Sequence, residues 1–166
     1  MKAITTFLSS VLLLSTCWAV ESPPGYYHDG TNIFPAPPGT FVAAANQTTT
    51  TPCPLGHYTP VAGMSQAIPA SPGYFVPMIG AATQTPAPAG SYVSVSGAAA
   101  ATPCAPGTYT PSAGMSSPIP SSPGYYVSSS GASTQVAAPA GGFTSDPGSS
   151  AYLPAEIGKY APVAGM

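Results

Sequence analysis

The sequence predicts an elongated all-β or irregular repeat protein, and three observations support that fold class. Nine glycines are each followed two residues later by an aromatic residue. These glycines recur every 17 residues, after a first interval of 14 residues. Proline and glycine contribute 23 and 18 of the 166 residues, a composition that disfavours helices. A fixed period is typical of repeat proteins, in which each unit buries its apolar face against its neighbours.

Residues 1–19 are predicted to form a cleaved signal peptide. Lys2 supplies a positive charge, the stretch from Ile4 to Leu14 is mostly apolar, and Ala19 precedes the first acidic residue, Glu21. This order of features is that of a secretory signal. The apolar run is shorter than the about 20 residues that a membrane-spanning helix needs. We therefore expect a secreted or cell-surface protein with no integral membrane span.

The remaining chain divides into a short N-terminal repeat or cap, residues 20–38, and tandem repeats over residues 39–166. Within the cap, His28, Asp29 and Gly30 are interpreted as a turn. If the first glycine of each repeat is position 0, the ring stands at position 2, a second glycine at position 7 and a proline at position 13. Aromatic and β-branched residues favour a short extended segment after the first glycine, and the second glycine makes another turn.

The nine rings are expected to form one structural aromatic column. They are Tyr27, Phe41, Tyr58, Phe75, Tyr92, Tyr109, Tyr126, Phe143 and Tyr160. The glycines that we expect to shape the turns include Gly56, Gly63, Gly73, Gly80, Gly90, Gly97, Gly107, Gly114, Gly124 and Gly131. Asn46 replaces the second glycine once, which indicates a left-handed backbone at position 7, because Gly and Asn tolerate it best.

Two arrangements of the repeats fit this pattern. In a β-solenoid each repeat is a rung, and the rings stack roughly 4.8 Å apart. In a string of small modules, each ring packs on the turn of the next repeat. Both arrangements place the ring column in the core, because burying an aromatic side chain contributes about 1.5–3 kcal/mol.

A longer period of 51 residues, or three repeats, overlies the first. The stretch from Tyr58 to Met64 returns from Tyr109 to Met115 and again from Tyr160 to Met166. We interpret this super-repeat as the duplication of a three-repeat block, and a three-repeat structural unit is an alternative.

Cys53 and Cys104 are the cysteines that remain after the signal peptide, and they share position 14 of the repeat. If the repeats stack as rungs, three intervals separate the two residues by roughly 14 Å. A disulfide needs Cα atoms within about 7 Å. The alternatives are free thiols, intermolecular thiols that pair between chains, or a fold that is not a regular stack.

The segments from Thr51 to Gly63 and from Thr102 to Gly114 resemble the cysteine-rich ephrin-receptor-like repeats, which read Cys-Pro-x-Gly-x-Tyr. The resemblance covers about Gly25 to Met166, but most cysteines of that pattern are replaced. It implies an extracellular structural or recognition module, which in that family is held together by disulfides.

The composition excludes several classes of function. Lys159 is the single strong base after the signal peptide, so binding to nucleic acid or to anionic lipid is not expected. His28 and His57 are the two histidines, and no catalytic set can be assigned from their spacing. Because the acidic residues are few and scattered, we expect no metal, no cofactor and no enzymatic activity.

These observations favour a secreted structural or surface-associated repeat protein that spaces, coats or adheres. Self-assembly, with copies joined head to tail, is a variant of this hypothesis. One alternative is an extracellular binding module for a repetitive surface, such as a glycan or ice. Another is a degenerate fragment of a longer repeat protein.

Overall fold

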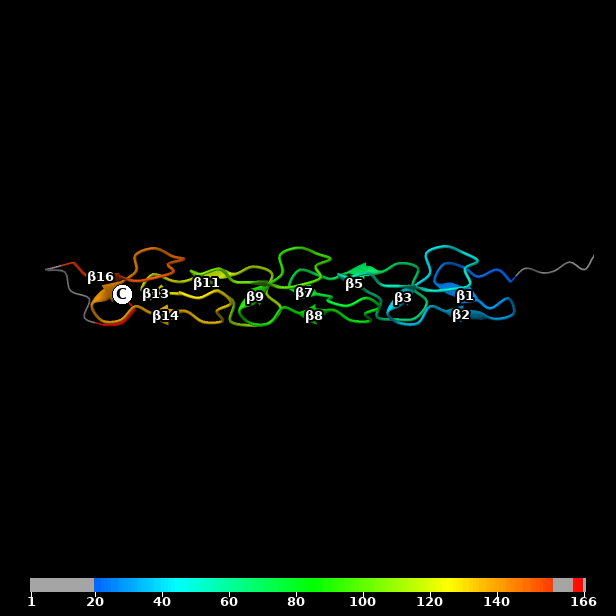
Figure 1. Ribbon diagram of the computed structural model, residues 1–166, viewed down its shortest axis with the longest axis horizontal. Coiled ribbons are helices and arrows are strands. Elements are labelled where there is room, and N and C mark those ends of the chain that lie inside the picture. Colours follow the sequence, from blue (N-terminus) through cyan, green and yellow to red (C-terminus); the bar gives the residue numbers. More distant parts are fainter. Residues whose placement is uncertain (1–19, 157–162, 166) are drawn as a thin grey trace, which may run out of the picture.

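The structure is a computed structural model that describes residues 20–156 and 163–165. The expected signal peptide, residues 1–19, and the last repeat's Gly158 and Tyr160 lie outside the described residues. The described part is all-β and contains no helix, so the all-β prediction is confirmed there. Its short strands follow one another along a single long axis (Figure 1).

Each repeat forms one small antiparallel hairpin, and every described sheet has two strands. The cap forms the longest hairpin, from β1 (Tyr26–His28) and β2 (Ile33–Pro35). The other pairs, in chain order, are β3 (Thr40–Phe41) with β4 (Thr51–Pro52), β5 (His57–Tyr58) with β6 (Ile68–Pro69), β7 (Tyr74–Phe75) with β8 (Thr85–Pro86), β9 (Ser91–Tyr92) with β10 (Thr102–Pro103), β11 (Thr108–Tyr109) with β12 (Ile119–Pro120), β13 (Tyr125–Tyr126) with β14 (Val136–Ala137), and β15 (Gly142–Phe143) with β16 (Leu153–Pro154).

The hairpin register explains why the ring and the proline recur at fixed positions. The ring at position 2 lies opposite position 12, as Tyr58 lies opposite Ile68. Position 1 lies opposite the proline at position 13, as His57 lies opposite Pro69. An aromatic residue beside a β-branched one is a favourable cross-strand pair. Because proline cannot donate a backbone hydrogen bond, it helps to keep the strands short.

A tight turn leads into each hairpin. In the repeat that begins at Gly56, the amide of His57 donates to the carbonyl oxygen of Pro54 (3.1 Å). Gly56 has a φ of 77°, which is the conformation that the third residue of a type II turn requires. The first glycine of each repeat therefore stands at the one turn position where a side chain would be strained.

The arrangement of the hairpins recurs every third repeat. In Figure 1, β3 and β9 occupy matching places, as do β5 and β11, and the pairs β7–β8 and β13–β14. The loops that follow β3, β9 and β15 project to the same side (Figure 1). The 51-residue spacing of the super-repeat equals this three-repeat recurrence, so equivalent residues of successive super-repeats lie on the same side.

The centre of the structure is made of small residues and not of the rings. Tyr58 and the other described rings at position 2 are half-buried. The buried residues at position 3 are Val42, Thr59, Val76, Val93, Thr110, Val127 and Thr144. Those at position 14, and at the equivalent place of the cap, are Ala36, Cys53, Ala70, Ala87, Cys104, Ser121 and Ala138. The rings cover this narrow core from outside, as Tyr58 does where it packs on Ala70, Val76 and Ala81.

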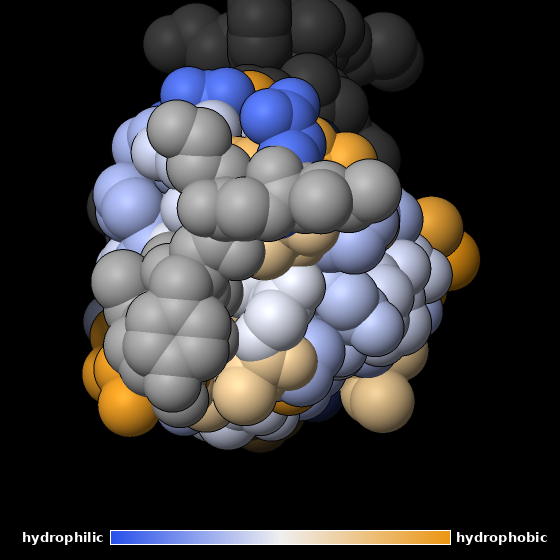
Figure 2. Space-filling view, turned by 90° about the vertical axis from the view of Figure 1, so that its left-hand side faces the viewer, coloured by the Kyte–Doolittle hydropathy of each residue, from blue (hydrophilic) through white to orange (hydrophobic). Residues whose placement is uncertain are grey.

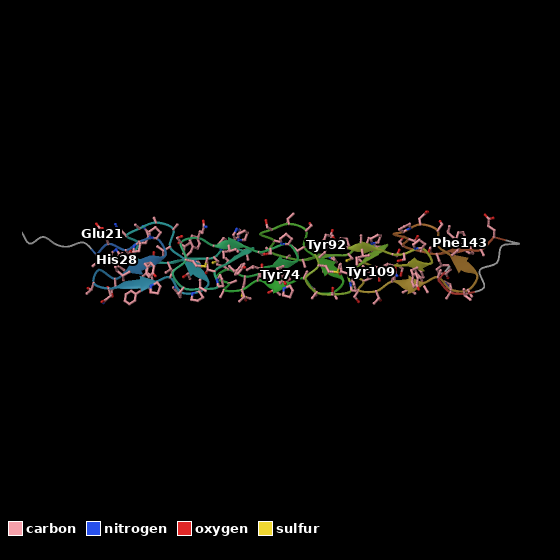
Figure 3. All side chains as sticks on the ribbon, turned by 180° about the vertical axis from the view of Figure 1, so that it is seen from behind. Glu21, His28, Tyr74, Tyr92, Tyr109 and Phe143 are labelled. Atoms are coloured by element: carbon pink, nitrogen blue, oxygen red, sulfur yellow. The ribbon has the colours of Figure 1, made fainter. Side chains whose placement is uncertain are left out.

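The rings also do not stack on one another as a column. The close ring pairs of the described residues are Tyr27 with Phe34, at 5.5 Å between centroids, and Tyr126 with Tyr152, at 5.3 Å. Each of these pairs joins a position-2 ring to an aromatic residue at another position. Tyr92, Tyr109 and Phe143 are seen at separate points along the axis in Figure 3.

Candidate functional site

The candidate functional feature is the set of backbone contacts that join each repeat to the next two. Neighbouring repeats are joined by two hydrogen bonds of the same kind at each step. The amide of Gly56 donates to the carbonyl oxygen of Val76 (3.0 Å), and the amide of Thr59 donates to that of Ala81 (3.2 Å). Since these bonds use main-chain atoms, they depend little on the side chains of the loops.

A second set of contacts joins each repeat to the one after its neighbour. The amide of Gly97, at position 7, donates to the carbonyl oxygen of Ala70, which lies two repeats earlier (2.8 Å). The same bond recurs at Gly63, Gly80, Gly114, Gly131, Gly148 and Gly165. Asn46 makes the equivalent bond with a φ of 59°, in the left-handed region.

The first glycine of each repeat allows this approach over two repeats. A Cβ added to Gly56 would overlap the carbonyl oxygen of Gly97 and stand 2.7 Å from its carbonyl carbon. Gly39, Gly73, Gly90 and Gly107 meet the position-7 glycine two repeats later in the same way. One contact between repeats therefore requires both glycines. The glycine at position 0 is needed because a side chain there would collide with the backbone, and the glycine at position 7 is needed because its φ is positive.

Cys53 and Cys104 lie inside this core. Both are free and fully buried. Thr59 Oγ1 donates to the carbonyl oxygen of Thr40 (3.1 Å), so the Cys53 thiol, 3.3 Å from the same Oγ1, is the donor in their contact. Cys104 and Thr110 repeat the arrangement at 3.5 Å. The alternative in which these thiols pair between chains would require the buried sulfur atoms to leave the core.

The N-terminal end is closed by Ser22 and Asn46. The amide of Asn46 donates to the carbonyl oxygen of Ser22 (2.8 Å). Along the described chain, this is the first of the hydrogen bonds that join repeats two apart. The residue equivalent to Ser22 in later repeats stands at position 14. Its amide donates to the carbonyl oxygen of the first glycine of the same repeat, as the amide of Cys53 donates to Gly39. No such glycine precedes Ser22 among the described residues, and its amide donates to Asn46 Oδ1 instead (2.9 Å). The asparagine side chain thus completes the end of the backbone network.

The turn of the cap hairpin is held by Asp29. Its Oδ1 accepts hydrogen bonds from the amides of Asn32 (2.7 Å) and Thr31 (2.8 Å). The bond from the Asn32 amide, followed by that from Thr31, lowers the pKa of the Asp29 carboxyl from its usual 3.8. His28 Nδ1 accepts from the amide of Gly30 (3.2 Å). His28 and Asp29 therefore both serve the turn that the sequence indicates.

Neither a metal site nor a membrane-spanning helix is found in the part of the chain that the structure describes. No group of three or more His, Cys, Asp or Glu side chains gathers there. Over the same ranges, no helix has the length and apolar character that crossing a bilayer takes. His57 is half-buried in β5, where its Nδ1 is 3.1 Å from the carbonyl oxygen of Leu55.

The surface is weakly polar, with single apolar side chains at the loop tips. Seen along the axis from the β16 end, pale polar colours prevail and apolar residues stand at the rim (Figure 2). Position 5 carries Val61, Met78 and Val95 in three successive repeats, with exposed fractions of 59%, 63% and 62%. The next three repeats carry Ser112, Ser129 and Asp146 there. The loop tips thus change from apolar to polar along the chain.

The threonines at position 12 of the described hairpins do not form a continuous row along the axis. Residues at position 12 that are three repeats apart lie on the same side of the axis. On one side Thr51 and Thr102 are succeeded by Leu153, and on another Thr85 is succeeded by Val136.

Searches against protein-family models and against curated proteins found no match to this chain. The likeness to ephrin-receptor-like repeats therefore remains a resemblance of sequence rhythm.

The small core residues at positions 3 and 14 were not identified from the sequence, although the glycines that make the contacts between repeats were. Val, Thr, Ala and Ser at positions 3 and 14 do not by themselves indicate a core, and the two cysteines at position 14 raised only the question of disulfide pairing. The signal of these core residues was the restriction to small side chains in the repeats that follow the cap.

Proposed function

We propose that this chain is a secreted, non-catalytic structural rod that spaces or coats an extracellular surface. In this proposal the hairpins are the rungs of a solenoid-like array. One observation carries the proposal: each repeat is hydrogen-bonded through its backbone to both of the next two repeats. Repeats coupled beyond their immediate neighbours resist bending, because a bend at one junction must also break the bonds that cross it.

The composition of the surface supports the same function. Charged residues make up 4% of the chain, so electrostatic recognition of a charged partner is weak. The loop residues outside the backbone network vary freely between repeats, as the change from Met78 to Ser112 and Ser129 illustrates. A structural spacer needs the constant backbone network and tolerates such variation.

Small-angle scattering of the mature chain, residues 20–166, tests the proposed rod. We expect the profile of a rigid rod, with a maximum dimension several times the cross-section and unchanged over a range of concentrations. A compact globule or a random coil would contradict the proposal. Expression of the full chain in a secretory host, with immunodetection in the medium or on the cell surface, tests the proposed export.

Adhesion through the loop tips is a second candidate function. It is favoured by the exposed Val61, Met78, Ile79 and Val95, which place apolar side chains on the surface in three successive repeats. The double substitution of Met78 and Ile79 by Ser gives this loop the polar character of the later repeats. If adhesion is the function, the double variant loses self-association in sedimentation or retention on an apolar surface, while its melting temperature is unchanged.

A further inference from the structure

We propose that Asn46 is a site of N-linked glycosylation, and that its side chain both carries the glycan and closes the end of the structure. The inference rests on the proposed function in one respect, since the chain must enter a secretory route. Asn46, Gln47 and Thr48 form an Asn-x-Thr acceptor sequence in which the middle residue is not proline. The other asparagine, Asn32, is followed by Ile33 and Phe34 and has no such sequence.

The place of Asn46 in the structure suits this modification. Asn46, Gln47 and Thr48 are all exposed. They lie in the loop that follows β3, which projects from the side of the structure (Figure 1). Thr48 makes no side-chain hydrogen bond that would hold its hydroxyl away from the asparagine within the described part. An attached glycan therefore extends into solvent without displacing any buried group.

The oxygen of the Asn46 carboxamide accepts a hydrogen bond, and its nitrogen is the atom that glycosylation would modify. Oδ1 accepts the amide of Ser22 at 2.9 Å, while Nδ2 makes no hydrogen bond to the described residues. N-glycosylation forms a bond between Nδ2 and C1 of the sugar. The bond between C1 and the phosphate oxygen of a lipid diphosphate donor breaks, the nitrogen loses one proton, and the lipid diphosphate leaves with the electron pair. Because the product is still an amide, its carbonyl oxygen keeps its contact with Ser22.

Two substitutions separate the modification from the structural role of Asn46. Thr48→Ala removes the acceptor sequence and leaves the contact between Asn46 and Ser22 in place. Ser or Ala stands at the equivalent position of the other described repeats, as at Ser65 and Ala82, so the fold tolerates this change. Thr49→Ala is the matched control, because it removes a neighbouring exposed threonine and keeps the acceptor sequence.

The experiment is expression of the full chain and both variants in a eukaryotic secretory host. The readouts are digestion with an N-glycosidase and mass spectrometry of the peptide that contains Asn46. We expect one glycan on the wild-type chain and on Thr49→Ala, and none on Thr48→Ala, with equal melting temperatures when all three chains are produced without glycosylation. A secreted wild-type chain without a glycan would overturn the inference and leave the proposed function standing. A chain that never enters the secretory route would overturn both.

Discussion

The carbonyl oxygen of Gly97 occupies the space that a side chain on Gly56 would need. These residues are two repeats apart, and the adjoining amide of Gly97 bonds to Ala70 of the repeat that begins at Gly56. The approach of these two backbone segments sets the width of the core. It leaves room for Val, Thr, Ala and Cys, and it pushes the rings outward.

Gly56→Ala should therefore destabilise the protein severely. The variant combines a φ of 77° with an overlap against backbone atoms that cannot move without breaking the contact between repeats. We expect a loss of about 4 kcal/mol or more, the range seen for severe substitutions. Denaturant unfolding of wild type and variant measures it.

Gly30→Ala is the matched control for this substitution. Gly30 has a φ of 95°, but an added Cβ there meets no atom within 4 Å. We expect a loss of about 1–2 kcal/mol, which is the cost of a left-handed backbone alone. Equal losses at Gly30 and Gly56 would show that the contact with Gly97 contributes nothing.

Asn46→Gly should destabilise the N-terminal end even though glycine is the usual residue at position 7. The left-handed backbone is kept, but the amide of Ser22 loses its acceptor, Asn46 Oδ1. An unpaired buried donor costs about 1–3 kcal/mol. Thermal melts of chains produced without glycosylation compare this variant with Asn46→Asp, which retains an acceptor oxygen. If both variants were as stable as the wild type, the side chain of Asn46 would have no capping role.

The thiols of Cys53 and Cys104 should be unreactive in the folded protein. Both side chains are fully buried, so alkylation requires the core to open. We expect no labelling by iodoacetamide under native conditions and complete labelling in denaturant, with Ser112→Cys as an exposed control. Native labelling at the rate of the control, or disulfide-linked dimers in air, would contradict the buried positions.

The cap hairpin should weaken at acidic pH because of Asp29. Backbone hydrogen bonds lower the pKa of its carboxyl below 3.8 in the folded state, so the charged form stabilises the hairpin. This contribution is complete above the unfolded-state pKa and is lost as the pH falls through the lower folded-state pKa. Amide exchange at Thr31 and Asn32, measured from pH 5 to pH 2, follows the loss. Asp29→Asn should remove the dependence, and a variant with an unchanged pH profile would exclude Asp29 as its source.

The turns could be predicted from the sequence, because Gly and Asn report directly on backbone angle. Asn46 in place of a second glycine indicated a left-handed residue, and its φ is 59°. The short extended segments, and the lack of helix over the residues that the structure describes, followed from the rings and prolines in the same direct way. These are local properties that one repeat specifies by itself.

The core could not be predicted, because it depends on which repeats touch. A period of 17 residues shows that Gly56 and Gly97 each stand at a position that recurs along the chain, but it does not show that these two positions meet. Once they meet, the space between repeats is too narrow for Tyr58 or Tyr92, and Val76 and Ala70 fill it. The capping role of Asn46 Oδ1 is hidden for the same reason, since Ser22 lies 24 residues away in the chain.

Native-state amide exchange at the second glycines tests the central claim most directly, because these amides form the bonds over two repeats. We expect slow exchange, with similar free energies of opening, at Gly63, Gly80, Gly97, Gly114, Gly131 and Gly148. The amide of Gly30, in an exposed turn, should exchange rapidly in the same sample. If the six glycines exchanged as rapidly as Gly30, the repeats would not be joined in the way described.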